Sequence, residues 1–247
     1  LKDSGAKAIV IIENFCATLQ KCIANTAVKH VVLAAMGDRL GLIKGAIVNY
    51  VVRKVKKLLP DFSLPGAVRY NDAIAKGQGA PFNAPQIGPD DVAVLQYTGG
   101  TTGVAKGAML THRNLVANTD QFKAVMPDAT RPGQEVIVTA IPLYHIFSLM
   151  VNLVPNPREF DGFIDTMKKA RPSVFMGVNT LYAGLVAHPK SQEVDWSNLK
   201  LAGGGGSAVI GAVSDKWLAM TGTFIREGYG LSETSPILTV NPASGQR

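Results

Sequence analysis

Short runs of β-branched apolar residues alternate with helix-length segments along most of the chain. Residues 8–12 read Ala-Ile-Val-Ile-Ile and residues 30–34 read His-Val-Val-Leu-Ala, and each run has the length of a buried strand. Residues 14–25, between them, have the pattern of a helix. A strand, a helix and a second strand in this order predict a βαβ crossover, and therefore an α/β fold.

The same alternation continues through the rest of the chain. We predict strands at 92–96, 135–141, 173–176, 200–202 and 223–226, and helices at 111–126, 180–187 and 208–220. The segment 61–91 is rich in proline and glycine, which predicts a connector that is mostly loop. The expected fold is therefore α/β, with mixed or parallel sheets flanked by helices.

Residues 42–59 are expected to form one long amphipathic helix. Apolar residues recur there at helical spacing, and cations gather towards the C-terminal end, where they suit the helix dipole. Two interpretations stay open. The helix either packs on one side and is otherwise solvated, or presents a surface that touches an anionic membrane.

Composition narrows the class of protein. Of 247 residues, 47% are hydrophobic and 17% are charged, which is typical of a globular protein. The net charge of +7 suits nucleic acid, an anionic membrane or anionic substrates. We expect no nucleic-acid partner, because the sequence has no zinc-finger spacing, helix-turn-helix pattern or RNA-binding aromatic motif. Cys16 and Cys22 have no companion metal ligands, which predicts reduced thiols in a cytoplasmic protein.

The strongest chemical signal is a run of glycine, threonine and lysine after the strand predicted at 92–96. It reads Tyr97-Thr98-Gly99-Gly100-Thr101-Thr102-Gly103-Val104-Ala105-Lys106-Gly107, followed by Ala108. Glycines expose backbone N–H groups, threonines add donors and the lysine adds a positive charge, as a triphosphate requires. The run is not a Walker A sequence, because Gly107 follows Lys106. The alternative is a flexible turn.

This run resembles the phosphate-loop motif of the adenylate-forming superfamily, which includes acyl-CoA synthetases, luciferases and peptide-synthetase adenylation domains. Two further motifs of that superfamily follow in the expected order: Pro-Leu-Tyr-His-Ile-Phe at 142–147 and Gly-Tyr-Gly-Leu-Ser-Glu-Thr at 228–234. Taken alone, His145 is better explained as a structural histidine, and the third motif is weak evidence. The three motifs in order favour the superfamily.

The resemblance implies a role for each matched residue. His145 would steady the acyl carboxylate, Lys106 would offset phosphate charge, and Glu233 would bind Mg²⁺ with Thr98 close by, so Lys106, His145 and Glu233 are the expected catalytic residues. Tyr229 would stack on adenine. The expected nucleotide-binding set is the loop from Tyr97 to Ala108 together with Gly228, Tyr229, Gly230 and Ser232, the last as a donor to the α-phosphate.

Four consecutive glycines occupy positions 203–206. They are predicted to follow a strand and to precede a helix, where bare backbone can approach a ligand closely. The alternative is a flexible linker. The resemblance maps Gly204, Gly205 and Gly206 to one face of an adenine pocket.

Within the superfamily, residues 177–181 (Gly-Val-Asn-Thr-Leu), the preceding Arg171-Pro172 and the segment 42–59 are most similar to bacterial long-chain fatty-acid–CoA ligases. Gly177 and Val178, with His145, would border the acyl pocket, although they are equally well explained as core and turn residues. The resemblance implies ATP, Mg²⁺ and coenzyme A as cofactors or co-substrates and a long-chain fatty acid as substrate. Two alternatives remain: a ligase for shorter or aryl acids, and a non-catalytic nucleotide-binding module.

Some parts of the superfamily pattern are not found. We expect residues 1–247 to be a partial N-terminal AMP-binding domain, with the C-terminal domain and its catalytic lysine absent and with little turnover by this chain alone. The segment after residue 152 is roughly a dozen residues shorter than the superfamily spacing. A cytoplasmic location, peripheral on the inner face of a bacterial membrane, and a homodimer are further hypotheses.

Overall fold

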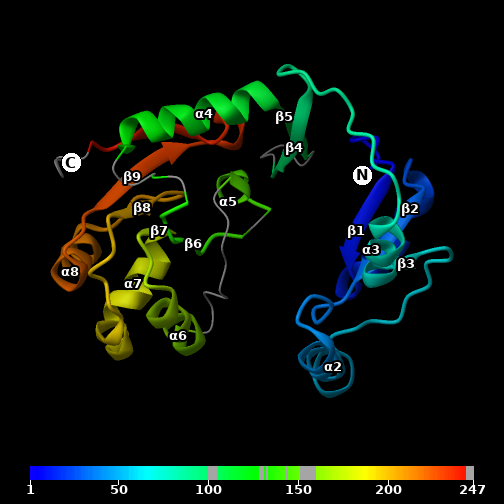
Figure 1. Cartoon of the computed structure of the whole chain (residues 1–247), viewed down its shortest axis with the longest axis horizontal. Coiled ribbons are helices and arrows are strands. Elements are labelled where there is room, and N and C mark those ends of the chain that lie inside the picture. Colours follow the sequence, from blue (N-terminus) through cyan, green and yellow to red (C-terminus); the bar gives the residue numbers. More distant parts are fainter. Residues whose placement is uncertain (100–104, 128–130, 132, 143, 151–159, 243–247) are drawn as a thin grey trace. The chain divides into compact units, whose positions relative to one another are not determined.

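The computed structural model describes residues 1–99, 105–127, 131, 133–142, 144–150 and 160–242 (Figure 1). The chain divides into two compact units, Leu1–Gln86 and Ile87–Arg247. Each unit combines strands with helices, and its parallel pairing confirms the predicted α/β fold. Within the part of the chain that is described, no helix is long and apolar enough to cross a membrane.

A three-stranded parallel sheet forms the centre of the first unit. Strand β1 (Ala8–Ile12) pairs with β2 (His30–Ala34), which pairs with the two-residue β3 (Val68–Arg69). The sequence prediction is confirmed for β1 and β2. The segment 61–91 is mostly loop, as predicted, but it also contains β3 and helix α3 (Tyr70–Gln78), which the sequence prediction did not identify. A strand of two residues has no periodicity of its own and forms by pairing with β2.

The connection from β1 to β2 corrects the helix predicted at 14–25. It consists of a 3₁₀ turn, the short helix α1 (Cys16–Gln20) and a second 3₁₀ turn at Ile23–Asn25. The Thr26 hydroxyl donates to the Ile23 carbonyl at 2.8 Å. Such a side-chain bond competes with helical hydrogen bonds and helps to end the segment.

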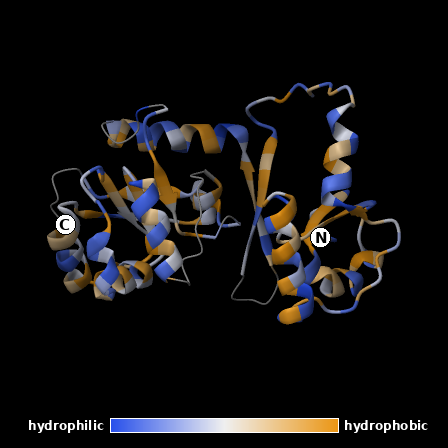
Figure 2. Cartoon of the chain, turned by 60° about the horizontal axis from the view of Figure 1, so that its bottom comes forward, coloured by the Kyte–Doolittle hydropathy of each residue, from blue (hydrophilic) through white to orange (hydrophobic). Residues whose placement is uncertain are grey.

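Helix α2 (Leu42–Tyr50) continues as a π-helical turn at Val51–Val55. The prediction that the helix reaches residue 59 is therefore wrong. Lys57 has a φ of 47°, and a left-handed residue cannot continue a right-handed helix. Figure 2 shows that α2 is mostly hydrophobic, with interspersed hydrophilic positions.

A buried ion pair network joins three elements of the first unit. Glu13 is 1% exposed, and its carboxylate lies 2.8 Å from Arg53 Nε and 3.0 Å from Arg69. Burial alone would raise the pKa of Glu13, but hydrogen bonds and charge from the two arginines outweigh it and lower the pKa. The sequence analysis placed Arg53 in the basic end of the amphipathic helix. The structure shows that it forms an ion pair with Glu13 inside the unit.

The second unit is built around a five-stranded sheet in the order β10-β9-β8-β7-β6. Its strands are β6 (Ile137–Thr139), β7 (Val174–Gly177), β8 (Leu201–Gly204), β9 (Ile225–Gly230) and β10 (Ile237–Val240). Strands β6 to β9 are parallel and β10 is antiparallel to β9. The strand predicted at 135–141 is shorter than expected. The strand predicted at 223–226 begins at Ile225 and extends to Gly230, because Gly228 and Gly230 pair with β10.

Helices cover both faces of this sheet (Figure 1). On one face, α6 (Phe160–Ala170), α7 (Asn179–Ala187) and α8 (Gly211–Thr221) pack around Phe175, Tyr182 and Trp217. On the other face, α4 (His112–Val125) and α5 (Ile146–Met150) pack against Met176 and Leu201. The sequence prediction missed α5 and α6.

Strands β4 (Val92–Thr98) and β5 (Lys106–Thr111) form a separate antiparallel hairpin. The run of glycine and threonine therefore begins and ends in paired strand rather than lying wholly in a loop. Gly100, Thr101, Thr102, Gly103 and Val104 lie outside the described residues, as does the predicted shortening after residue 152. Thr111 caps α4, with a reciprocal hydrogen bond to Asn114.

Candidate functional site

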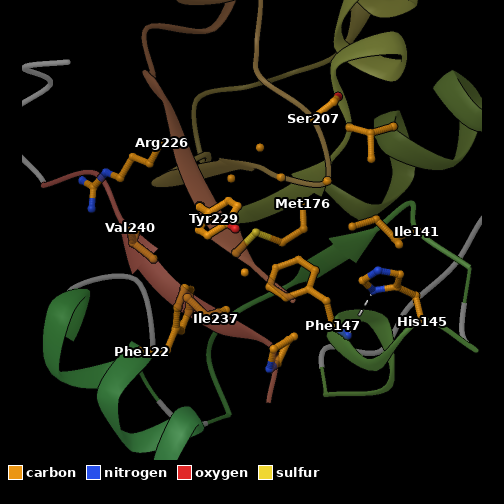
Figure 3. Close-up of a pocket in the computed structure, with 18 of the residues that line it drawn as sticks. Phe122, Ile141, His145, Phe147, Met176, Ser207, Arg226, Tyr229, Ile237 and Val240 are labelled. Carbon is orange, nitrogen blue, oxygen red and sulfur yellow. Dashed lines mark hydrogen bonds between the residues drawn. The ribbon is translucent and has the colours of Figure 1, made fainter. Parts of the chain in front are cut away.

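A cavity of about 350 Å³ lies at the carboxyl ends of β8 and β9 (Figure 3). This is the edge at which ligands bind in open parallel sheets, because the loops after each strand meet there. Residues from β7, from the segment after β6 and from helices α4 and α5 complete the lining. Segments more than a hundred positions apart in the sequence therefore share one site.

Nine of the residues singled out in the sequence line this cavity. They come from the second motif, the glycine run, the segment after β7 and the third motif: His145, Val178, Gly204, Gly205, Gly206, Gly228, Tyr229, Gly230 and Ser232. The parallel register places Gly204 directly opposite Glu227, one residue before the third motif. The sheet therefore brings the glycine run and the tyrosine motif together.

Several other predicted residues do not line the cavity. A Cβ added to Gly177 would meet Phe175, Leu181 and Tyr182, so this glycine faces the core rather than the cavity. The hairpin residues also lie outside the lining: Tyr97, Thr98, Gly99, Ala105, Lys106, Gly107 and Ala108. The 3₁₀ turn Ser232–Thr234, which contains Glu233, nevertheless packs beside β5.

The residues predicted to hold Mg²⁺ come from neighbouring elements. Thr98 pairs with Lys106 across the hairpin, and its hydroxyl donates to the Lys106 carbonyl at 3.5 Å. Within the described ranges, no three histidine, cysteine or acidic side chains form a ready-made metal cluster. One carboxylate and one hydroxyl fit Mg²⁺ only where a bound phosphate supplies further oxygens, which is how this ion is commonly held.

His145 lies just before α5, at the rim of the cavity. The backbone N–H of Phe147 donates to His145 Nδ1 at 3.3 Å, drawn as a dashed line in Figure 3. In a neutral imidazole whose Nδ1 accepts, Nε2 carries the proton. The exposed ring can therefore donate a hydrogen bond to an anionic oxygen.

Glycine is required at two lining positions for steric reasons. A Cβ on Gly204 would lie 2.7 Å from a Val209 methyl, and a Cβ on Gly230 would clash with the Pro236 carbonyl. Gly206 has a φ of 78°, in the left-handed region that favours glycine. Because the neighbouring atoms leave no room for a side chain at Gly204 and Gly230, the backbone at these positions is exposed to the cavity.

Three polar side chains that the sequence analysis missed hold the loop after β8. The Tyr182 hydroxyl donates to the Gly203 carbonyl at 2.8 Å, and burial raises the pKa of Tyr182, so this donor stays protonated. The Glu227 carboxylate accepts from Val209 N–H, and Asn179 Oδ1 accepts from Ile210 N–H at 3.0 Å. Asn179 lies within the quoted segment 177–181 and Glu227 directly precedes the third motif, and these positions were the available signal.

Large apolar side chains form much of the remaining lining. They are Phe122, Met126, Ile141, Phe147, Met176, Leu201, Ile237 and Val240. The sequence analysis did not predict these residues, because nothing in their local pattern distinguishes a cavity wall from a filled core. Tyr229, by contrast, is 60% exposed, so its ring has a free face for stacking.

The AMP-binding enzyme family model matches residues 1–247. The chain is 45% identical over 254 residues to the long-chain-fatty-acid–CoA ligase of Escherichia coli O6:H1, a match that covers 98% of this chain and 45% of that protein. It is 31% identical to the ligase of the same name from Bacillus subtilis, again over 98% and 45% of the two chains. The chain thus spans about half the length of these relatives.

Solved structures agree on the fold. An anthranilate CoA ligase in complex with anthranoyl-AMP superposes with a TM-score of 0.77 at 20% identity, over all of this chain and 45% of that one. A long-chain-fatty-acid-CoA ligase from Archaeoglobus fulgidus gives a TM-score of 0.66 at 23% identity, over 98% and 46%. The family model covers the whole chain and the fold agrees, so the chain belongs to the AMP-binding enzyme family.

Proposed function

We propose that this chain is the ATP-binding, acyl-adenylate-forming part of a long-chain fatty-acid–CoA ligase. One observation carries the proposal: a single cavity is lined both by the glycine run with the tyrosine motif and by large apolar side chains. Such a cavity fits a ligand with a nucleotide at one end and a hydrocarbon chain at the other. The 45% identity to a long-chain-fatty-acid–CoA ligase supports the same substrates.

In this reaction a carboxylate oxygen attacks the α-phosphorus of ATP, and pyrophosphate leaves. The thiolate of coenzyme A then attacks the acyl carbonyl, and AMP leaves. We assign the hydrogen bond to the carboxylate to His145 Nε2, the stacking on adenine to Tyr229, and donation to the α-phosphate to Ser232. Gly204, Gly205 and Gly206 would border the adenine.

The hairpin and the turn beside it would hold the phosphates. Lys106 at the start of β5 would offset their charge, and Thr98 and Glu233 would hold Mg²⁺ together with phosphate oxygens. When bound, Mg²⁺ supplies charge neutralisation on the phosphates. The proposed nucleotide set also includes the loop positions Gly99 to Ala108.

We further propose that residues 1–247 are part of a larger N-terminal AMP-binding domain. The relatives are about twice as long, and the proposed second step would depend on a further domain. The chain alone should therefore bind ligands but turn them over poorly.

The proposal is tested by calorimetric titration of the chain with ATP and Mg²⁺, and with a non-hydrolysable palmitoyl-adenylate analogue. Tyr229→Ala should weaken nucleotide binding roughly tenfold, because stacking on a base is worth about 1–3 kcal/mol. Tyr50→Ala removes an equally exposed tyrosine outside the cavity and is the matched control. Absence of nucleotide binding, or equal effects of the two substitutions, would contradict the proposal.

A panel of carboxylic acids separates the alternatives. Tighter binding of hexadecanoate than of short-chain or aryl acids supports a long-chain ligase. The reverse order indicates another adenylate-forming ligase, and nucleotide binding with no acid binding indicates a non-catalytic module.

A peripheral membrane role rests on a separate observation. Leu42 and Ile43 on α2 are 94% and 81% exposed, and Lys44, Lys54 and Lys56 are exposed on the same segment. Apolar side chains flanked by lysines favour adsorption to anionic lipid. Co-sedimentation with anionic but not zwitterionic vesicles would support this role and an inner-membrane location. The homodimer stays a hypothesis for analytical ultracentrifugation.

A further inference from the structure

One lining residue has a permanent charge. Among the described residues around the cavity, Arg226 is the one whose side chain is cationic at every physiological pH. It lies in β9 opposite Gly203 of β8 and is half-buried. Within the described part of the chain, its guanidinium has no carboxylate partner.

The surroundings of Arg226 are apolar. Met176, Leu201 and Val240 line the same part of the cavity, on the sheet face covered by α4. A cation beside apolar side chains is costly unless an anion or hydrogen-bond acceptors compensate it. The guanidinium donors of Arg226, which have no partner among the described residues, are therefore suited to an anionic group of a ligand.

The position of Arg226 indicates which end of the ligand it meets. In Figure 3, Tyr229 and Met176 lie between Arg226 and His145. Arg226 precedes Tyr229 by three residues in an extended strand, which corresponds to about 10 Å. A fatty acid whose carboxylate lies near His145 would pass the apolar lining residues and approach Arg226 with its other end.

We propose that Arg226 is a specificity-determining residue that favours acyl substrates with a second carboxylate at the far end, namely long-chain α,ω-dicarboxylic acids. A guanidinium binds a carboxylate through two parallel hydrogen bonds, which gives both affinity and directionality. This inference rests on the proposed function, since it takes the first carboxylate to lie near His145. The same guanidinium chemistry would suit a nucleotide phosphate, and the test has to separate the two.

The test is competition against a fluorescent fatty acid bound to the purified chain. The competitors are hexadecanoic acid and hexadecanedioic acid, which differ in the terminal carboxylate. Wild type is compared with Arg226→Leu, which keeps the apolar stem, and with Arg226→Lys, which keeps the charge. Lys216→Leu removes one exposed positive charge on α8 and is the matched control. Circular dichroism establishes that each variant is folded.

We expect Arg226→Leu to lower the affinity for the diacid relative to the monoacid by roughly tenfold or more, the usual effect of losing a charge-assisted hydrogen bond. Arg226→Lys should retain part of the preference and Lys216→Leu all of it. An unchanged ratio in Arg226→Leu overturns the inference while leaving acyl binding, and hence the proposed function, intact. Weaker ATP binding in the same variant with an unchanged acid ratio assigns Arg226 to the phosphates. If neither acid binds, both the proposed function and the inference fail.

Discussion

Glu135 provides the sharpest test of what stabilises the second unit. Its side chain is 4% exposed and lies two residues before β6, while Lys200 lies directly before β8. Lys200 Nζ is 2.9 and 3.0 Å from the two carboxylate oxygens, and Arg131 Nε is 3.3 Å from one of them. A hydrogen bond from Ser173, with the two cations, outweighs burial and lowers the pKa of Glu135 to about 2.

The magnitude follows from that pKa. A fall from 4.5 to about 2 in the folded state corresponds to at most about 3 kcal/mol of stability at neutral pH. Lys200 and Arg131 are 31% and 53% exposed, so water can solvate them once the carboxylate is neutralised. We therefore expect Glu135→Gln to lower the free energy of unfolding by about 2 kcal/mol. Because the folded pKa is depressed, this stabilisation is present above pH 4.5 and is lost as the pH falls towards 2.

Urea unfolding, followed by tryptophan fluorescence, measures this effect in the second unit. The chain has two tryptophans, Trp196 and Trp217, and both lie in the core of the second unit. Glu193→Gln is the matched control, because Glu193 pairs with Lys168 but is 56% exposed, and an exposed pair contributes little to stability.

The reasoning fails if Glu135→Gln costs no more than Glu193→Gln at neutral pH. It also fails if the difference between wild type and Glu135→Gln is the same near pH 2 as at pH 7. The first outcome would mean that the network contributes no more than a surface pair, and the second that the cost is steric rather than electrostatic.

Two further substitutions test an ion pair of the first unit and a close backbone contact of the second. Glu13→Gln should destabilise the first unit by about 2 kcal/mol at neutral pH, because Arg53 and Arg69 lose the anion that compensates them but, being 34% and 53% exposed, can be solvated, and hydrogen exchange of β1 and β2 would report the loss. Equal protection in the variant would contradict this. Gly230→Ala should reduce nucleotide binding by tenfold or more, because the added methyl meets the Pro236 carbonyl and shifts the backbone, and unchanged binding in a calorimetric titration would refute the steric argument.

The elements that the sequence predicted well are those with a local cause. Residues 8–12 and 30–34 are strands with the predicted bounds, and the helix predicted at 180–187 begins one residue earlier, at Asn179. Their β-branched runs and helical spacing act within a few residues. Helix α6 carried an equally readable signal, since its buried residues Phe163, Ile164 and Met167 recur at helical spacing, but the prediction omitted it.

The sequence by itself also determined which chemical groups are present: glycines that expose backbone, the histidine of the second motif, the tyrosine of the third motif, and the order of the three motifs. Only the tertiary structure decided which of these share a cavity. Strand register, a non-local property, places Gly204 beside β9, turns Gly177 towards the core and leaves Arg226 on the cavity wall opposite Gly203. Side chains on one strand alternate between faces, so a shift of one residue in pairing would have exchanged core and cavity positions. No pattern within β9 alone fixes that choice.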